Sequence, residues 1–467
     1  MAILHGLSPA PVGHCRVLEI ACGDGANLIP MAYAIPGSEF VGFDLAGAPI
    51  LRGQARIGEL GLKNARLFQG DLLEVGAGFG QFDYIIAHGI YAWAPEPVRD
   101  RVLALCAELL ADHGVAFISY NAMPGGFLRL MLRDMMLFRI QDIDDPLKRV
   151  EEGMAFLHLV CEARPEDDPY RPILEAQIKR MDRPNLGAVR HDEMSEAYQP
   201  VHFLELAQHA QKHGLQYLCE SVLPPPPDPG YREEINQTLE SAAAGDFLRK
   251  EQLLDFVRLR AYRETLLCRK ERLVRRDFPA ECFRHLLFAS QTTPAEGEKP
   301  GATAFVLPGG IKMESNHPGV TALLLELGKA WPYALSFESL EPILAGAGLA
   351  LDAQGVALLV RLAISQMIKF RAWNPSLART IPERPKASAV SRQEVLTHDR
   401  ITSLLHLVVR VEDANARTLL KRLDGSLTHA ELLQAMAAVL PEAPLDELEA
   451  RLEEALRNFH RSGILEA

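Results

Sequence analysis

RVLEIACGDGANLIPMAYAIPGSEFVGFD, residues 16–44, decides the fold of the first part of the chain. Its two short apolar runs, 16–20 and 40–44, are typical of buried parallel strands. The segment 27–34 between them has a helical pattern, and a Pro-Gly pair ends that helix. A strand, a glycine-rich turn, a helix and a second strand in this order predict a sheet that binds a nucleotide-type ligand at its edge.

The glycine turn distinguishes between nucleotide cofactors. A dinucleotide site favours GxGxxG, but Leu28 stands where the third glycine would be. S-adenosylmethionine (SAM) fits better, because Asp44 can bind its ribose, Asp71 its adenine amino group, and nearby acids balance its sulfonium charge. The pattern E-x-A-x-G-x-G and the two aspartates predict SAM bound by Glu19, Ala21, Gly23, Gly25, Asp44 and Asp71. NAD, or a turn that binds no ligand, are the alternatives.

The composition argues against several classes of protein. A chain of 467 residues that is 48% apolar can form large cores, and we expect about two to four domains. Its net charge of -12 argues against DNA binding. The seven scattered cysteines lack CxxC spacing and favour a reducing compartment. Without a signal-peptide pattern or an apolar run long enough to span a membrane, we expect a cytoplasmic protein.

Strands and helices continue to alternate after the opening stretch. We predict strands at 65–71, 82–89 and 115–121, and an amphipathic helix over 97–114 that Gly114 ends. Such alternation is typical of a doubly wound parallel sheet, which makes the fold class α/β.

The later part of the chain is divided by changes of pattern. We pair 215–222 with 262–270 as the last two strands of the sheet, with insertions around them. Three helices and a strand beyond residue 272 suggest a winged-helix-like module, and 374–391, rich in Pro, Ala and Ser, is predicted to be a linker. The tail contains a helix-turn-helix with Gly425 at its bend. We predict a SAM-binding core, a helical insertion, the rest of the sheet with a regulatory segment, a middle winged-helix-like domain and a C-terminal helix-turn-helix domain at 1–125, 126–200, 201–272, 273–385 and 386–467.

The fourth and fifth predicted strands end in residues suited to methyl transfer. The run AHGIYAWAPEP lies at the carboxyl edge, where ligands of open α/β sheets bind. Methyl transfer is an in-line displacement, so the protein mainly aligns a neutral nucleophile. An aromatic pocket disfavours the ammonium form of lysine, and a tyrosine hydroxyl can orient the amine. We predict catalytic roles for His88, Tyr91, Tyr120 and Asn121, and substrate binding by Tyr91 and Trp93. Packing against the following helix is the alternative for Tyr91 and Trp93.

A pair of histidines has spacing that could bind a metal ion. His209 and His213 are four residues apart in a predicted helix. No carboxylate motif and no paired cysteine accompany them in the sequence, so we predict solvated or capping histidines and no metal site.

Several segments resemble the bacterial class I methyltransferases that carry a methyltransferase regulatory domain. That group includes the rickettsial-type protein lysine methyltransferases, which act on outer-membrane proteins. The tail segment LLKRLDGSLTHAELL is similar to their C-terminal winged-helix region. The other matching segments are VLEIACGDGANLIPMA, FVGFDL, FDYIIAHGIYAWAP, ISYNAMPGG, PYRPILEAQIKRM, FLELAQHAQKHGLQYLCES, DFVRLRAYRETLLCRK and HPGVTALLLELGKAWPYALSFESL.

The resemblance implies a Rossmann-like class I methyltransferase sheet with helical insertions, followed by winged-helix-like α+β modules. It implies a SAM pocket at the residues named above together with His88, and it puts His88 and Tyr91 beside the reactive methyl group. The additional domains would bind a protein substrate or support a homodimer. With the site residues it favours a methyltransferase that acts on lysine side chains of a protein. A methyltransferase for a small molecule, and a SAM- or substrate-binding protein without turnover, are the alternatives.

Overall fold

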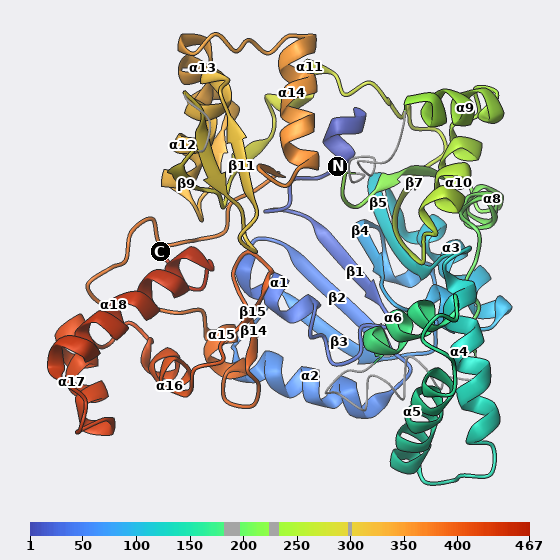
Figure 1. Ribbon diagram of the computed structural model, residues 1–467, viewed down its shortest axis with the longest axis horizontal. Helices are drawn as coiled ribbons and strands as arrows, with labels where there is room; N and C mark the ends of the chain where they lie inside the picture. The colour runs from blue at the N-terminus through green and yellow to red at the C-terminus, as the bar shows by residue number, and fades with distance from the viewer. Residues whose placement is uncertain (182–196, 224–232, 298–300) are drawn as a thin grey trace.

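A seven-stranded mixed sheet forms the centre of the protein (Figure 1). This computed structural model describes residues 1–181, 197–223, 233–297 and 301–467. The strand order is β3-β2-β1-β4-β5-β7-β6, and β7 runs antiparallel to both of its neighbours, while the other pairs are parallel. The predicted pairing of the last two strands is therefore confirmed. The strands are β1 (Arg16–Ile20), β2 (Glu39–Asp44), β3 (Ala65–Gln69), β4 (Phe82–Ala87), β5 (Leu110–Asn121), β6 (Leu215–Glu220) and β7 (Tyr262–Arg269).

Both faces of this sheet are buried, as a parallel sheet requires. In β1, Leu18 and Ile20 belong to the core on one face, whereas Val17 belongs to the core on the other. The covering elements are α1 (Leu28–Ala34), α2 (Gly47–Glu59), η2 (Ala77–Phe79), η3 (Tyr91–Trp93), α3 (Glu96–Leu109), α8 (Phe203–Lys212), α9 (Glu233–Ala243) and α10 (Phe247–Arg258).

Helix α3 ends earlier than the sequence predicted. The helix predicted to reach Gly114 stops at Leu109, and residues 110–114 belong to β5. A register shift explains this: Leu110 pairs with Phe82, and the ladder resumes at Val115. The chain thus enters the sheet through an irregular stretch that carries no strand-like alternation in its sequence.

Among the described residues, the three helices that directly follow β5 have a small core of their own. They are α4 (Gly126–Arg139), α5 (Pro146–Glu162) and α6 (Arg171–Met181). Leu132 and Met136 of α4 pack with Leu157 of α5 and Ile178 of α6. This insertion continues the chain from the carboxyl end of β5, so it stands at the ligand-binding edge of the sheet.

The middle part of the chain combines small antiparallel sheets with helices. One sheet has the order β12-β8-β13 and the other β11-β10-β9. Leu4, from the 3-10 turn η1 (Ala2–His5), lies in the core of this part. The elements are α11 (Ala280–Phe283), β8 (Leu287–Ala289), β9 (Thr293–Glu296), β10 (Thr303–Val306), β11 (Lys312–Ser315), α12 (Pro318–Ala330), β12 (Leu335–Ser336), α13 (Phe337–Gly346), α14 (Ala353–Ile364) and β13 (Lys369–Arg371).

The C-terminal part is a separate helical module with one short hairpin. The predicted helix-turn-helix is confirmed, with Gly425 in the left-handed region between two of its helices. The predicted linker at 374–391 is irregular up to Ser388 and packs against the C-terminal part: Ala387 is buried and forms a bridge to Leu465, and the last three residues begin α15. The elements are α15 (Ala389–Glu394), β14 (Arg400–Thr402), β15 (Val408–Arg410), α16 (Ala414–Arg422), α17 (His429–Val439) and α18 (Leu445–Arg461). Across the described ranges, none of the helices combines the length and the apolar character that crossing a bilayer needs.

Candidate active site

The carboxyl edge of the sheet brings predicted cofactor residues from neighbouring strands together. In the strand register Ile20 is paired with Phe43 on one side and with Ala87 on the other. The residue after each of these continues the edge, so Ala21 stands between the ends that carry Asp44 and His88. This is the edge at which open α/β sheets bind ligands.

The glycine turn that follows β1 has the backbone that its sequence predicts. Ala21, Gly23 and Gly25 all have positive φ, at 56°, 57° and 73°. A Cβ atom on Gly25 would lie 2.8 Å from Cδ1 of Leu67, so this position needs glycine for its space as well as its φ. The Gly23 N–H donates to Asp44 Oδ2 over 2.9 Å. Asp44 therefore holds the turn in place at the predicted ribose site.

Glu19 is a buried acid with an unused acceptor atom. Only 4% of the residue is exposed. Its Oε1 accepts from Asn27 Nδ2 over 2.8 Å, while Oε2 has no hydrogen-bond partner among the described residues. Burial raises the pKa of this carboxyl to about 7, and the Asn27 contact only partly opposes the rise. A buried acceptor without a partner is costly, so the pocket suits a ligand with a positive charge or N–H donors. SAM has both in its amino-acid end and sulfonium, so the residues present fit this cofactor.

Asp71 lies just beyond β3, two strands from the glycine turn. The N–H of the preceding Gly70 donates to the Asp44 carbonyl over 3.0 Å, which ties the two strand ends together. Asp71 is half-buried, and its Oδ1 accepts from the Leu73 N–H over 2.9 Å. The predicted adenine contact thus stands on the same edge as the predicted ribose contact.

A cavity of about 380 Å³ opens beside His88 at the same edge. It is lined by the ends of β4 and β5 and by the inserted helices, including His88, Trp93, Asn121, Arg129, Arg180, Tyr198 and Tyr262. Ser119, which is fully buried, accepts from the Gly89 N–H over 2.9 Å and lies 3.0 Å from His88 Nδ1. This contact fixes the imidazole and leaves Nε2 as the ring atom that can reach a ligand.

An aromatic pair forms one wall of the cavity. The rings of Trp93 and Tyr198 lie 4.5 Å apart between centroids. Arg129 stands 5.0 Å from the Trp93 ring, and Arg133 stands 4.8 Å from the Tyr198 ring. Sequence reasoning identified Trp93 but missed Tyr198 and the arginines, because they come from the insertion and carry no motif.

Two tyrosines with predicted catalytic roles do not line this cavity. Tyr91 is 3% exposed, and its Oη lies 2.8 Å from His209 Nδ1. Tyr120 is 1% exposed, and its Oη accepts from Thr265 Oγ1. Burial raises the pKa of both phenols well above the usual range, so both stay neutral. We therefore keep His88 and Asn121, but neither tyrosine, as residues that can touch an acceptor.

Three family profiles match successive parts of the chain. They are a methyltransferase domain at residues 18–116, a predicted methyltransferase regulatory domain at 187–269, and the C-terminal winged helix domain of PKMT at 383–446. The first covers the glycine turn and strands β2 to β4, and the second includes α8 to β7.

Curated proteins of Rickettsia prowazekii are similar to long parts of the chain. The uncharacterized protein RP789 is 32% identical over 278 residues, which is 59% of this chain and 50% of that protein. The alignment thus spans half the length of that relative. The uncharacterized protein RP028 is 31% identical over 216 residues, which is 46% of this chain and 86% of that protein.

The fold is similar to a solved structure over nearly its whole length. The structure of PKMT2 from Rickettsia typhi in complex with AdoHcy superimposes with a TM-score of 0.88. The superposition covers 99% of this chain and 96% of that chain at 23% sequence identity. The sheet, the insertion and the two later modules therefore share one arrangement with that protein.

Proposed function

The chain belongs to the family of class I methyltransferases with a methyltransferase regulatory domain, which makes SAM its cofactor, and we propose that it methylates lysine side chains of a protein. The observation that carries this proposal is the cavity between the cofactor edge and the inserted helices. The cavity is lined by the aromatic pair of Trp93 and Tyr198 and by Arg129 and Arg180, and it borders His88. Its chemistry suits a long apolar side chain that ends in a neutral nucleophile.

The cavity favours lysine in its reactive form. The four-carbon stem of lysine packs well on the faces of Trp93 and Tyr198. The apolar faces of these two rings disfavour the charged ammonium and favour the free amine. Only the free amine has the lone pair that methyl transfer needs.

The residues of this chain position the two reactants and take no covalent part in the methyl transfer. When bound, SAM supplies an electrophilic methyl group. Glu19 and Asp44 would hold the cofactor at the carboxyl edge, where His88 follows the neighbouring strand. The Asn121 side chain, at the end of β5, can accept an N–H of the incoming amine and orient its lone pair. His88, fixed by Ser119, borders the path between the two ligands.

Radiolabelled SAM can identify the acceptor class directly. The protein is incubated with labelled SAM and denatured bacterial extract, and modified lysines are located by mass spectrometry. We expect label in protein, on lysine, and its loss in an Asn121→Ala variant that still binds SAM. Thr238→Ala is the matched control, because Thr238 lies on the exposed surface of α9 and lines no part of the cavity. Label that enters only small metabolites would refute the protein substrate.

A small molecule as acceptor is the second candidate. The cavity of about 380 Å³ beside Asn121 has the size for one, and the insertion would then act as a lid. The same experiment separates the two functions, because the label then appears in the low-molecular-weight fraction.

Four further predictions from the sequence remain proposals. They are the homodimer, the cytoplasmic location, the absence of DNA binding and the five-part division of the chain.

A further inference from the structure

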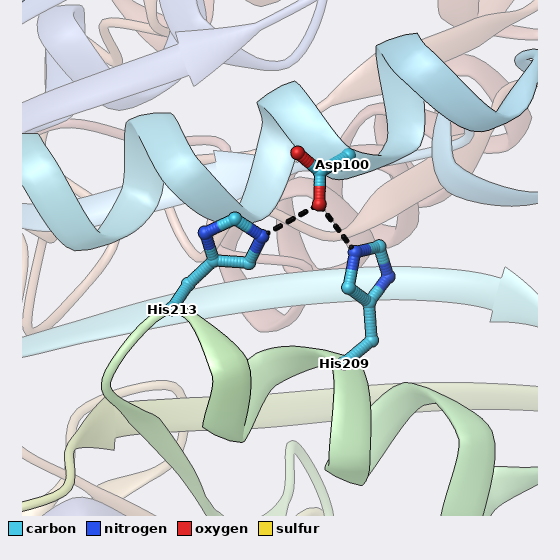
Figure 2. Close-up of side chains that lie close together, drawn as sticks. All are labelled: Asp100, His209 and His213. Carbon is cyan, nitrogen blue, oxygen red and sulfur yellow. Dashed lines mark hydrogen bonds and ion pairs between the residues drawn. The ribbon is translucent and has the colours of Figure 1, made fainter.

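Asp100 of α3, His209 of α8 and His213, the residue that follows α8, converge at one point of the surface (Figure 2). Asp100 Oδ1 lies 2.9 Å from His209 Nε2 and 2.7 Å from His213 Nε2. The three ligand atoms all lie within 4.8 Å of one another. The histidine side chains are 19% and 20% exposed and that of Asp100 is 55% exposed, so an ion can reach them from solvent.

Two imidazole nitrogens and a carboxylate oxygen are a preferred ligand set for zinc and related ions. With metal–ligand distances of about 2.0–2.2 Å, neighbouring ligands of a tetrahedral ion are about 3.3 Å apart. The contacts of Asp100 to His209 and His213 therefore need to lengthen by about 0.4 and about 0.6 Å. Asp100 is exposed and can make this adjustment, and its exposure also leaves room for water as a fourth ligand.

The other side of His209 is already held. Its Nδ1 lies 2.8 Å from the hydroxyl of Tyr91, which is buried in the core of the sheet. Histidines that bind metals usually have their second nitrogen held by such an outer partner, which directs the first nitrogen at the ion. The Tyr91 contact therefore orients His209 Nε2 toward Asp100 before any ion arrives.

We propose that Asp100, His209 and His213 bind a divalent transition-metal ion such as Zn²⁺, which fastens α8 to α3. Helix α3 lies in the region that matches the methyltransferase domain, and α8 lies in the region that matches the regulatory domain. Tyr91 shares the short turn η3 with Trp93 of the cavity wall. The ion thus joins the two domains and steadies one wall of the cavity. This inference does not depend on the identity of the methyl acceptor.

Cobalt and zinc titrations of the metal-free full-length protein test this site. After treatment with chelator, we expect Co²⁺ to bind once per chain and to produce the visible absorption of a low-symmetry Co²⁺ site. Zn²⁺ should displace it. Asp100→Asn and His213→Gln should each weaken Co²⁺ binding by roughly 100-fold or more, because each removes one of three protein ligands. His158→Gln, an exposed histidine on α5, is the matched control and should bind as the wild type does.

Thermal unfolding shows whether each variant is folded, so that a lost metal site can be told apart from a lost fold. Zn²⁺ should raise the melting temperature of the wild type and of His158→Gln, because the ion binds the folded state. It should not raise that of His213→Gln. Absence of saturable Co²⁺ binding by the wild type, or binding by Asp100→Asn and His213→Gln that is as tight as in the wild type, would show that the cluster is only a hydrogen-bonded contact between two helices.

Discussion

At the scale of single residues, two acids of the cofactor edge differ in their surroundings. Asp44 is half-exposed, and its two oxygens accept N–H groups of Gly23 and Ala46 over 2.9 and 2.8 Å. Glu19 is buried, with one oxygen bound by Asn27 and the other without a partner among the described residues. Asp44 therefore already has both oxygens engaged by the backbone, while the ionisation of Glu19 depends on what binds beside it.

Asp44→Ala should weaken SAM binding by about 100-fold, because charged hydrogen bonds of this kind contribute about 1.5–3 kcal/mol. Isothermal titration calorimetry measures the affinity, and thermal unfolding checks the fold. Asp24→Ala is the matched control: Asp24 lies in the same turn, and its Oδ1 accepts the Ala26 N–H. Equal affinities in the wild type and the Asp44 variant would remove Asp44 from the cofactor site.

Glu19 should make SAM binding dependent on pH. In the free protein its carboxyl has a pKa of about 7, raised by burial, so below that pH it carries a proton. A cationic ligand favours the carboxylate, so binding must release this proton. Affinity should therefore rise with pH by up to about tenfold per unit between roughly pH 5.5 and 7, then level off.

Glu19→Gln provides the control for this titration. Its amide cannot titrate, so the variant should bind SAM more weakly and lose the rise in affinity below pH 7. Calorimetry in two buffers of different ionisation enthalpy also counts the protons released. A wild-type affinity that does not change with pH, or a variant with the same slope, would contradict the role of Glu19.

At the scale of secondary-structure elements, the strands were predictable and their irregular ends were not. Short apolar runs followed by glycine or an acid located β1 to β4 to within a few residues, because buried parallel strands have this pattern. The end of α3 was missed because Leu110 fits a helix as well as a strand, and pairing with Phe82 decides between them. Asp100 was not predicted as a partner of His209, because only the packing of α8 on α3 brings them together.

The contact between β7 and its covering helices depends on a buried arginine. Arg263 is 1% exposed and donates two hydrogen bonds of 2.8 Å to Asp255 of α10, which is fully buried. It also donates to Glu220 of β6 over 2.7 Å and lies 4.1 Å from the Phe203 ring of α8. One side chain thus links two strands and two helices.

Arg263→Leu should lower the free energy of unfolding by about 3–5 kcal/mol, because the buried carboxylate of Asp255 then loses two charged hydrogen bonds and keeps only the longer contact of 3.2 Å to Arg260. Urea unfolding followed by circular dichroism measures the change. Arg249→Leu is the matched control, because Arg249 is exposed on the same helix as Asp255, and its effect should stay within about 0.5 kcal/mol. A similar small loss for both variants would show that the charge network contributes little.

At the scale of the whole molecule, the C-terminal module lies beside helices α1 and α2, which pack on β2 and β3 (Figure 1). Arg56 of α2 forms an ion pair with Glu394 of α15, and Tyr33 of α1 donates to Glu466. Between β14 and β15, His406 Nε2 lies 2.8 Å from Asn27 Oδ1. Sequence patterns predicted the helices of this module but not its position, because these contacts join residues more than 300 positions apart in the chain.

The side chain of Asn27 connects the C-terminal module to the cofactor pocket. Asn27 binds His406 with its oxygen and Glu19 with its nitrogen, so His406 fixes the amide orientation that Glu19 needs. His406→Ala should therefore weaken SAM binding by about 3- to 10-fold, the effect of losing one hydrogen bond. His398→Ala is the matched control, because this exposed histidine belongs to the same module and lies outside the contact.

A double-mutant cycle decides whether His406 acts through Asn27. Calorimetry on His406→Ala, Asn27→Ala and the double variant gives three losses of affinity relative to the wild type. If the two residues form one path to Glu19, the double variant should bind no more weakly than Asn27→Ala alone, since that path is already interrupted. Losses that add would mean that the C-terminal module affects the cofactor site by another route, and an unchanged affinity in His406→Ala would separate module and pocket altogether.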